Sequence, residues 1–184
     1  MKFQTLPFYL LAFLLCFCLL AKSQAPVGCD IPGIRAAFAA PGYYTELAGV
    51  VGQPCSMYFI NNNSQDAATS EAQAQTLGAH MCVMNDATEN ANVNAAINSA
   101  GFGGAIWIGY YRTAVNSPTF YALDGTTGNF NVPGPNAIYQ NWAGGEPNNY
   151  YGEDYTHTYG NGTWNDLDSV SGYASPQYGV VEIS

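Results

Sequence analysis

The chain has 184 residues, of which only 9% are charged, and its four Lys and Arg against 13 Asp and Glu give a formal net charge of −9. Such an acidic surface repels phosphate backbones and anionic lipids, which argues against nucleic-acid binding and against membrane insertion. The aromatic content of 14% argues against intrinsic disorder. We therefore expect one compact folded domain.

The first 25 residues have the layout of a secretory signal peptide. Lys2 precedes an apolar run too short for a comfortable membrane span, and small residues follow the run. A retained N-terminal anchor is the alternative. Removal of residues 1–25 takes away Lys2 and Lys22 but no acid, so the net charge becomes −11 and two arginines are the remaining cations. We expect a secreted or extracellular protein, or one displayed at the cell surface.

The mature chain is predicted to comprise an N-terminal extension, residues 26–54, and a domain, residues 55–184. Cys29 and Cys55 would tie the extension to the domain if they pair, which the sequence leaves open. Cys82 is then expected to be a small buried hydrophobic residue.

The domain is predicted to begin with a strand and a helix. Residues 55–60 form a short apolar and aromatic run that precedes a turn, which predicts a strand. The alanine-rich residues 64–78 predict a helix, with Ser64 or Asp66 as its N-terminal cap and a glycine at its end.

A second helix is predicted over residues 86–101, capped by Asp86 or Thr88. Residues 105–111 and 119–125 then predict two strands.

The stretch that follows this second strand, up to residue 162, is long, irregular and rich in Gly, Asn and Pro. Its aromatic residues favour an ordered functional loop over disorder. Residues 178–184 predict a final strand that pairs with residues 55–60.

Oxygen-bearing side chains are crowded in residues 144–154, GGEPNNYYGED, and recur in WND at 164–166. Calcium takes roughly six to eight oxygens from carboxylates, amide and backbone carbonyls and water. The two segments supply three acidic and two amide side chains of this kind: Glu146, Asn148, Glu153, Asn165 and Asp166. They predict a calcium site, whereas EPNN on its own would also suit an ordinary polar turn.

The order of two helices, WIG, NW, GEPNN, GED, GTWND and a terminal strand resembles the C-type lectin-like domain over about residues 55–184. The resemblance implies an α+β fold with two helices, small antiparallel sheets and a long calcium-binding loop. It implies that the five oxygen-bearing residues bind the principal calcium, with Asp166 also offering its backbone carbonyl. It also implies a cis bond between Glu146 and Pro147, which would turn the flanking carbonyl groups toward one ion.

The same resemblance implies sugar binding. In lectins of this family, Glu and Asn around the proline go with mannose, glucose, N-acetylglucosamine or fucose, whereas Gln and Asp go with galactose. The calcium ligands would also read two sugar hydroxyls, since carboxylates accept hydrogen bonds and amides donate them. Tyr150 and Tyr151, in the variable turn, are candidate sugar contacts.

The sequence therefore predicts a secreted, non-catalytic lectin whose partners are glycans or free sugars of the mannose type. The alternative is a C-type-lectin-like interaction or structural module that binds protein or ice, with calcium only ordering the loop. The sequence does not specify an oligomeric state.

The chain departs from the family pattern in two respects. Tyr155 stands where a cysteine is usual and the last strand has no cysteine, so the two customary disulfides are absent. Arg112 and Asn116 fall near the expected acidic ligands of an auxiliary calcium site, for which Asn149 and Asp154 remain candidates.

An enzyme is not expected. Glu146 and Glu153 would suit a glycosidase pair only at a suitable separation, and they are better used as calcium ligands. His80 and His157 have neither a nucleophile nor zinc-ligand spacing beside them.

Overall fold

The structure is a computed structural model. It describes residues 32–40, 42–47, 56–114, 117–125, 139–169 and 178–184. The predicted signal peptide, both Cys29 and Cys55, and Asn116 lie outside the described residues.

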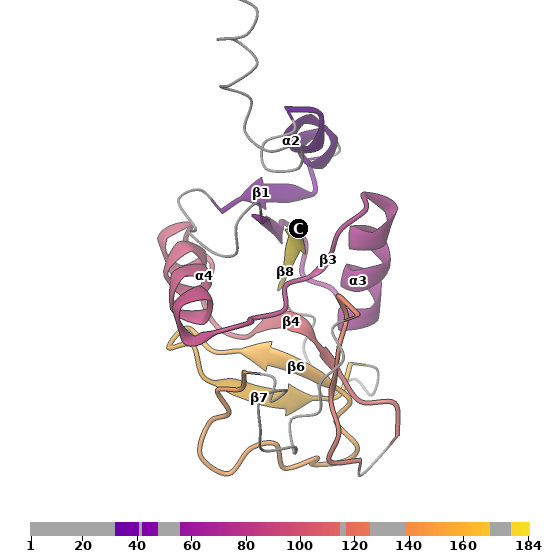
Figure 1. Cartoon of the computed structure of the whole chain (residues 1–184), viewed down its shortest axis with the longest axis vertical. Helices are drawn as coiled ribbons and strands as arrows, with labels where there is room; N and C mark the ends of the chain where they lie inside the picture. The colour runs from indigo at the N-terminus through magenta and orange to yellow at the C-terminus, as the bar shows by residue number, and fades with distance from the viewer. Residues whose placement is uncertain (1–31, 41, 48–55, 115–116, 126–138, 170–177) are drawn as a thin grey trace, which may run out of the picture.

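Three helices and eight strands make up the described chain (Figure 1). The helices are α2 (Pro32–Ala39), α3 (Ala67–Thr76) and α4 (Ala87–Ser99). The strands are β1 (Tyr44–Glu46), β2 (Met57–Asn61), β3 (His80–Met81), β4 (Ile106–Tyr111), β5 (Tyr121–Ala122), β6 (Tyr155–Thr158), β7 (Trp164–Leu167) and β8 (Tyr178–Ile183). This confirms the predicted α+β class. Among the described residues, no helix has the length and apolar character needed to cross a membrane.

The strands form one mixed sheet in the order β1-β2-β8-β4-β6-β7, with β3 added on β8 and β5 on β4. Only β4 and β8 pair in parallel, and the other named strand pairs are antiparallel. The predicted pairing of the last strand with the first strand of the domain is confirmed, with Phe59 opposite Val181. The site described below lies at the β6 and β7 end of this sheet (Figure 1).

The central strands are buried on both faces. In β2, Tyr58 and Ile60 belong to the core cluster under α4, whereas Met57 and Phe59 belong to the cluster under α3. Alternate residues of a strand point to opposite faces, so the two helices cover opposite faces of the sheet, on either side of it in Figure 1. A strand covered on both faces must be apolar throughout, which explains the continuous apolar runs in the sequence.

Both predicted helices begin at an aspartate. The carboxylate of Asp66 accepts a hydrogen bond of 2.7 Å from the backbone N–H of Thr69. The carboxylate of Asp86 accepts two bonds of 2.8 Å, from the N–H groups of Thr88 and Glu89. These bonds satisfy amides that have no partner in the first turn of a helix, and they select the aspartates over Ser64 and Thr88 as caps.

Several elements were not predicted. Helix α2 and strand β1 lie in the proposed extension, and β6 and β7 lie in the part of the chain read as irregular or as motif. The strand predicted over residues 119–125 is limited to Tyr121–Ala122. The prediction for Cys82 is confirmed, because its side chain is fully buried and free.

An asparagine ladder on α4 holds the turn between β6 and β7. Asn90, Asn94 and Asn98 are spaced four residues apart and so share one face of the helix. The amide of Asn90 donates to the carbonyl of Gly162 at 3.1 Å, and that of Asn98 donates to the carbonyl of Gly160 at 2.8 Å. The turn therefore rests on side chains of the helix rather than on apolar packing alone.

We predict that Gly109→Ala lowers the free energy of unfolding by about 3 kcal/mol, because overpacking a filled core is destabilising. Gly109 in β4 donates its N–H to the carbonyl of Cys82 at 2.8 Å. A Cβ there would overlap the carbonyl oxygen of Met81 and lie 2.8 Å from a methyl carbon of Val83. Denaturant unfolding gives the measurement.

The control is Gly103→Ala, where a new Cβ meets no atom within 4 Å and the backbone is not left-handed. This variant is expected to unfold like the parent chain. Equal losses in the two variants would contradict the close approach at Gly109.

Candidate functional site

The loop of residues 144–153 connects the segment that pairs with β7 to the start of β6. Its first stem is paired with the start of β7, because Ala143 donates its N–H to the carbonyl of Trp164 and Trp164 donates to that of Asn141, both at 2.8 Å. Trp164 is fully buried, and its indole N–H donates to the side chain of Asn90 on α4 at 3.0 Å. The bond between Glu146 and Pro147 is cis, as predicted.

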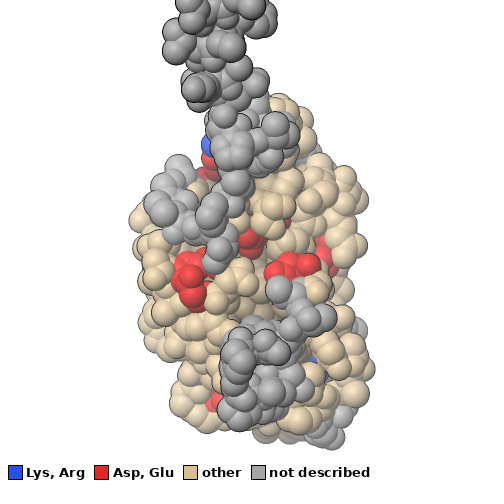
Figure 2. Space-filling model, viewed as in Figure 1, with Lys and Arg blue, Asp and Glu red and all other residues tan. Residues whose placement is uncertain are grey.

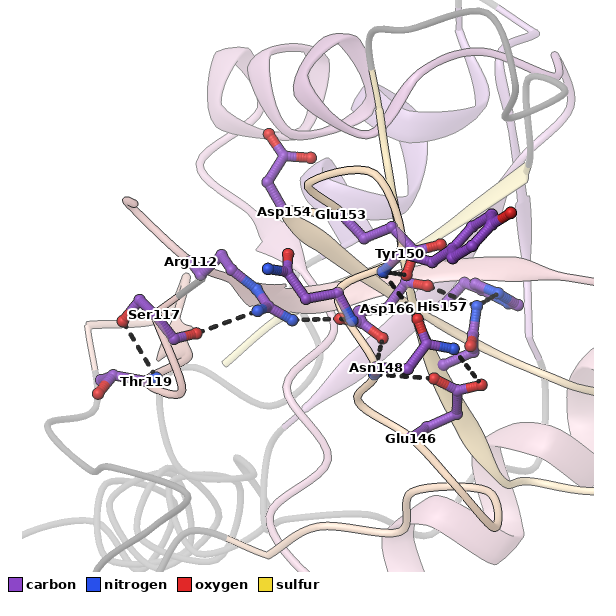
Figure 3. Close-up of polar contacts among 12 residues, drawn as sticks. Arg112, Ser117, Thr119, Glu146, Asn148, Tyr150, Glu153, Asp154, His157 and Asp166 are labelled. Carbon is purple, nitrogen blue, oxygen red and sulfur yellow. Dashed lines mark hydrogen bonds and ion pairs between the residues drawn. The ribbon is translucent and has the colours of Figure 1, made fainter. Parts of the chain in front are cut away.

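The carboxylate of Asp166 in β7 lies at the centre of the site and is fully buried. Its Oδ1 accepts the backbone N–H of Asn148 at 3.0 Å, and its Oδ2 accepts that of Asn149 at 2.9 Å. The guanidinium of Arg112 donates to the same Oδ2. In Figure 3, Arg112 approaches Asp166 from one side while Asn148 and Glu146 lie on the other. One carboxylate thus ties the loop to the residue that follows β4.

Glu146 and Asn148 lie side by side next to Asp166. The backbone N–H of Asn148 donates to Glu146 Oε2 at 3.0 Å, and its amide Nδ2 donates to Oε1 at 2.9 Å. The N–H of Tyr150 donates to Asn148 Oδ1 at 2.7 Å and to Glu153 Oε2 at 3.0 Å. The structure therefore brings four of the five predicted ligands together around one short stretch of backbone.

Asn165 is oriented by a buried histidine. Its Nδ2 donates to the backbone carbonyl of Asp166 and contacts Nε2 of His157 at 3.0 Å. Burial lowers the pKa of His157 to about 4, so the ring is neutral at pH 7 and Nε2 can accept. Within the described residues, Oδ1 of Asn165 makes no hydrogen bond, so the oxygen is the part of the amide left for a ligand.

The site has an excess of negative charge. In the part of the chain that the structure describes, Glu146, Glu153 and Asp166 have a single cation beside them, Arg112. Burial, followed by the charges of Asp166 and Glu146, raises the pKa of Glu153 to about 7, and Arg112 only partly opposes this shift. The pKa of Glu146 is raised as well, first by burial and then in part by Asp166. With all three carboxylates ionised, two negative charges remain uncompensated.

The side chains of the site are of the kind that binds calcium, but in this structure their oxygens are not oriented around a common point. Hard oxygen donors of mixed charge are the ligands that calcium prefers, and two unbalanced charges match a divalent ion. Within the described ranges, however, no group of three or more His, Cys, Asp or Glu side chains is arranged so that it could hold a metal ion. The oxygens of Glu146, Glu153 and Asp166 are turned instead to N–H donors of the loop.

Tyr150 and Tyr151 form the exposed tip of the loop. Their side chains are 64% and 73% exposed, and their ring centroids lie 4.2 Å apart. Tyr151 has a φ of 58°, in the left-handed region that bulky residues rarely adopt. Asp154, in contrast, points away from the cluster (Figure 3) and accepts the N–H of Ser169 at 3.3 Å.

The sequence did not indicate the roles of Arg112 and His157. Arg112 was noted only as a departure from acidic ligands, and nothing in its neighbours signals that its partner lies 54 residues further along the chain. His157 is an inward-facing residue of β6 opposite Asn165. The contact between His157 and Asn165 could have been inferred from the sequence only after residues 155–158 and 164–167 had been recognised as a hairpin.

The chain was compared with protein families and with known proteins. No family model matches it, and no curated protein sequence matches it. Many solved structures do match, and three are described here. A mouse scavenger receptor C-type lectin carbohydrate-recognition domain has a TM-score of 0.57 and 18% identity over 77% of this chain and 94% of that chain. Human lithostathine has a TM-score of 0.61 and 14% identity over 87% of this chain and 99% of that chain.

A calcium-independent type II antifreeze protein is the third similar structure, with a TM-score of 0.56 and 16% identity over 78% of this chain and 93% of that chain. Identities this low show the fold and leave the ligand open. The chain has the C-type lectin-like fold.

Proposed function

We propose that the chain is a secreted, calcium-dependent carbohydrate-binding protein without catalytic activity, and that it binds sugars of the mannose type. The observation that supports this best is the crowding of three carboxylates and two amides at one loop, beside which the described residues place a single cation, Arg112. The carbohydrate-recognition domain among the similar structures supports the same class of ligand.

Calcium would be held by the five residues named from the sequence: Glu146, Asn148, Glu153, Asn165 and Asp166. The ion would supply charge neutralisation and open coordination positions for hydroxyl oxygens. The protein's contribution is the arrangement of donors, which the loop and the β6 and β7 hairpin present at one end of the sheet.

Glu146 and Asn148 are suited to reading a hydroxyl. Their side chains already form a donor and acceptor pair, with Nδ2 and Oε1 2.9 Å apart. A sugar hydroxyl between them would donate to the carboxylate and accept from the amide, which replaces one bond with two. Asn165 is less suited to donate, because its Nδ2 is used by His157 and Asp166.

Tyr150 and Tyr151 would contact the sugar ring beyond the ion. Aromatic side chains offer a large apolar face with a polar tip, and both rings are exposed beside the carboxylates. The left-handed backbone at Tyr151 is a local cost that a binding role would explain.

The partners of this surface are expected to be neutral. Arg35 and Arg112 are the only Lys or Arg residues in the described part of the chain, and each is paired with an acid. Figure 2 shows acidic side chains across the middle of the visible face and very little basic surface. Glycans and free sugars suit this charge, whereas nucleic acid does not.

A second candidate is an interaction or structural module that binds protein or ice. It is favoured by two observations, the similarity to a calcium-independent antifreeze protein and the mutual hydrogen bonding of the loop's polar groups. In this case, calcium would only order the loop or would not bind.

The first prediction from this proposal concerns retention on immobilised sugar. The mature protein should be retained on mannose in calcium, released by chelator and by free mannose, and weakly held on galactose. The double variant Glu146→Gln with Asn148→Asp should lose mannose retention, because it exchanges the acceptor and donor that flank Pro147. Glu46→Gln, which removes an exposed acid elsewhere in the chain, should behave like the parent.

Calcium binding without retention on any sugar would favour the second candidate. Absence of calcium binding in a titration would refute the proposal.

A second prediction separates the charge of Glu153 from its packing. The pKa of Glu153 in the folded chain, about 7, lies above its ordinary value of 4.5, so the group stabilises the fold below its ordinary pKa, and that contribution is lost as pH rises through about 7. In chelator at about pH 8, Glu153→Gln should therefore melt no lower than the parent.

Excess calcium should reverse this order, because the parent keeps a charged ligand that the variant lacks. The variant's calcium affinity should be weaker by about tenfold or more. Thermal melts with and without calcium give both results, and equal calcium-induced shifts in the two proteins would exclude Glu153 as a ligand.

A third prediction concerns Tyr151. Tyr151→Gly should raise stability by about 1 kcal/mol, because glycine adopts the left-handed backbone without the steric cost of a Cβ. Retention on mannose should nevertheless weaken. If retention is unchanged while stability rises, Tyr151 does not contact the sugar.

A further inference from the structure

Arg112 lies immediately after β4, behind the loop, and is only 6% exposed. Its guanidinium is fixed on three sides. Nη1 donates to the carbonyl of Ser117 at 3.0 Å, Nη2 donates to Asp166, and the group lies 4.3 Å from the ring centroid of Phe120. Its backbone N–H also donates to the carbonyl of Asp154 at 2.8 Å. Arg112 is therefore a rigid, buried cation rather than a mobile surface arginine.

The partner of Arg112 is the group that holds the loop. Asp166 accepts the N–H groups of Asn148 and Asn149, 18 and 17 residues away along the chain. A buried carboxylate is stable as an anion only when a cation and hydrogen bonds compensate it. Arginine keeps its positive charge at any physiological pH, so Arg112 supplies the compensating cation, and the ion pair strengthens the hydrogen bonds that Asp166 accepts from the loop.

We infer that Arg112 is a positioning residue, a built-in cation that orders the loop of residues 144–153 through Asp166 before any metal binds. The loop then does not depend on calcium for its shape. The further consequence, that calcium compensates the charges of Glu146 and Glu153 while the charge of Asp166 is already compensated by Arg112, rests on the proposed function.

The test is residue-resolved amide hydrogen exchange by NMR in chelator and in excess calcium. In the parent chain, the amides of Asn148 and Asn149 should be protected in chelator, and calcium should change their protection little. In Arg112→Gln, their protection in chelator should fall by about tenfold or more, because the carboxylate that holds them has lost its counter-charge. Amides of β2 and β8 should keep theirs.

Two further variants guard against a general loss of folding. Arg112→Lys keeps the charge but not the fork of donors, and it should recover part of the protection at Asn148 and Asn149. Ser117→Ala should keep the protection of Asn148 and Asn149, because Arg112 bonds to the backbone carbonyl of Ser117, whereas the hydroxyl accepts the N–H of Thr119 at 3.2 Å.

The outcomes separate this inference from the proposed function. Unprotected Asn148 and Asn149 amides in the parent without calcium would overturn the role of Arg112, as would full protection in Arg112→Gln. If the chelator results are as expected but calcium neither binds nor restores protection in Arg112→Gln, the inference stands and the calcium proposal fails.

Discussion

The buried carboxylate of Asp166 is the contact on which the functional end of the molecule depends. It joins three segments that are distant in the chain: β7, which carries it, the loop through the N–H groups of Asn148 and Asn149, and the end of β4 through Arg112. A loop without regular structure has few backbone hydrogen bonds of its own, and an ionised acceptor forms stronger bonds than a neutral one. The positions of Glu146 and Asn148 therefore depend on the carboxylate of Asp166 and on its ion pair with Arg112.

Helix α4 fixes the position of the hairpin of β6 and β7, which carries Asp166. The asparagine ladder fixes the turn between β6 and β7, and Asn90 also accepts the indole N–H of Trp164, the residue two before Asp166. Thr158, the last residue of β6, donates to Asn94 at 2.9 Å. Apart from the exposed Asn98, the side chains of this network are buried and hydrogen-bonded, so the network fixes the geometry of the hairpin as well as stabilising it. It gives a physical account of how the hairpin is held where disulfides would be expected from the family resemblance.

The sequence was most informative where one local rule decided the structure. Asp86 could be read as a helix cap, and the apolar runs could be read as buried strands, because neither depends on distant residues. Strand β6 was not recognised, since its buried Thr156 and Thr158 are polar and match no apolar alternation. Motif spacing named the acidic and amide residues of the loop, and the structure places them near each other. It could not give the role of Arg112, because the meaning of a lone arginine depends on which carboxylate the fold brings to it.

The two cations of the proposed site would differ in kind, and the difference has a physical reason. A guanidinium is held by a covalent stem and fills its own space, so Arg112 can neutralise Asp166 permanently but offers no position to a ligand. A calcium ion keeps coordination positions that water or hydroxyl oxygen can exchange. Arg112, fixed behind the loop, would order the loop, and an exchangeable calcium ion beside Glu146 and Glu153 would bind the ligand. With Arg112 near a position where the family resemblance implies an acidic calcium ligand, the calcium ion would still bind at the site, but its role would be limited to ligand recognition.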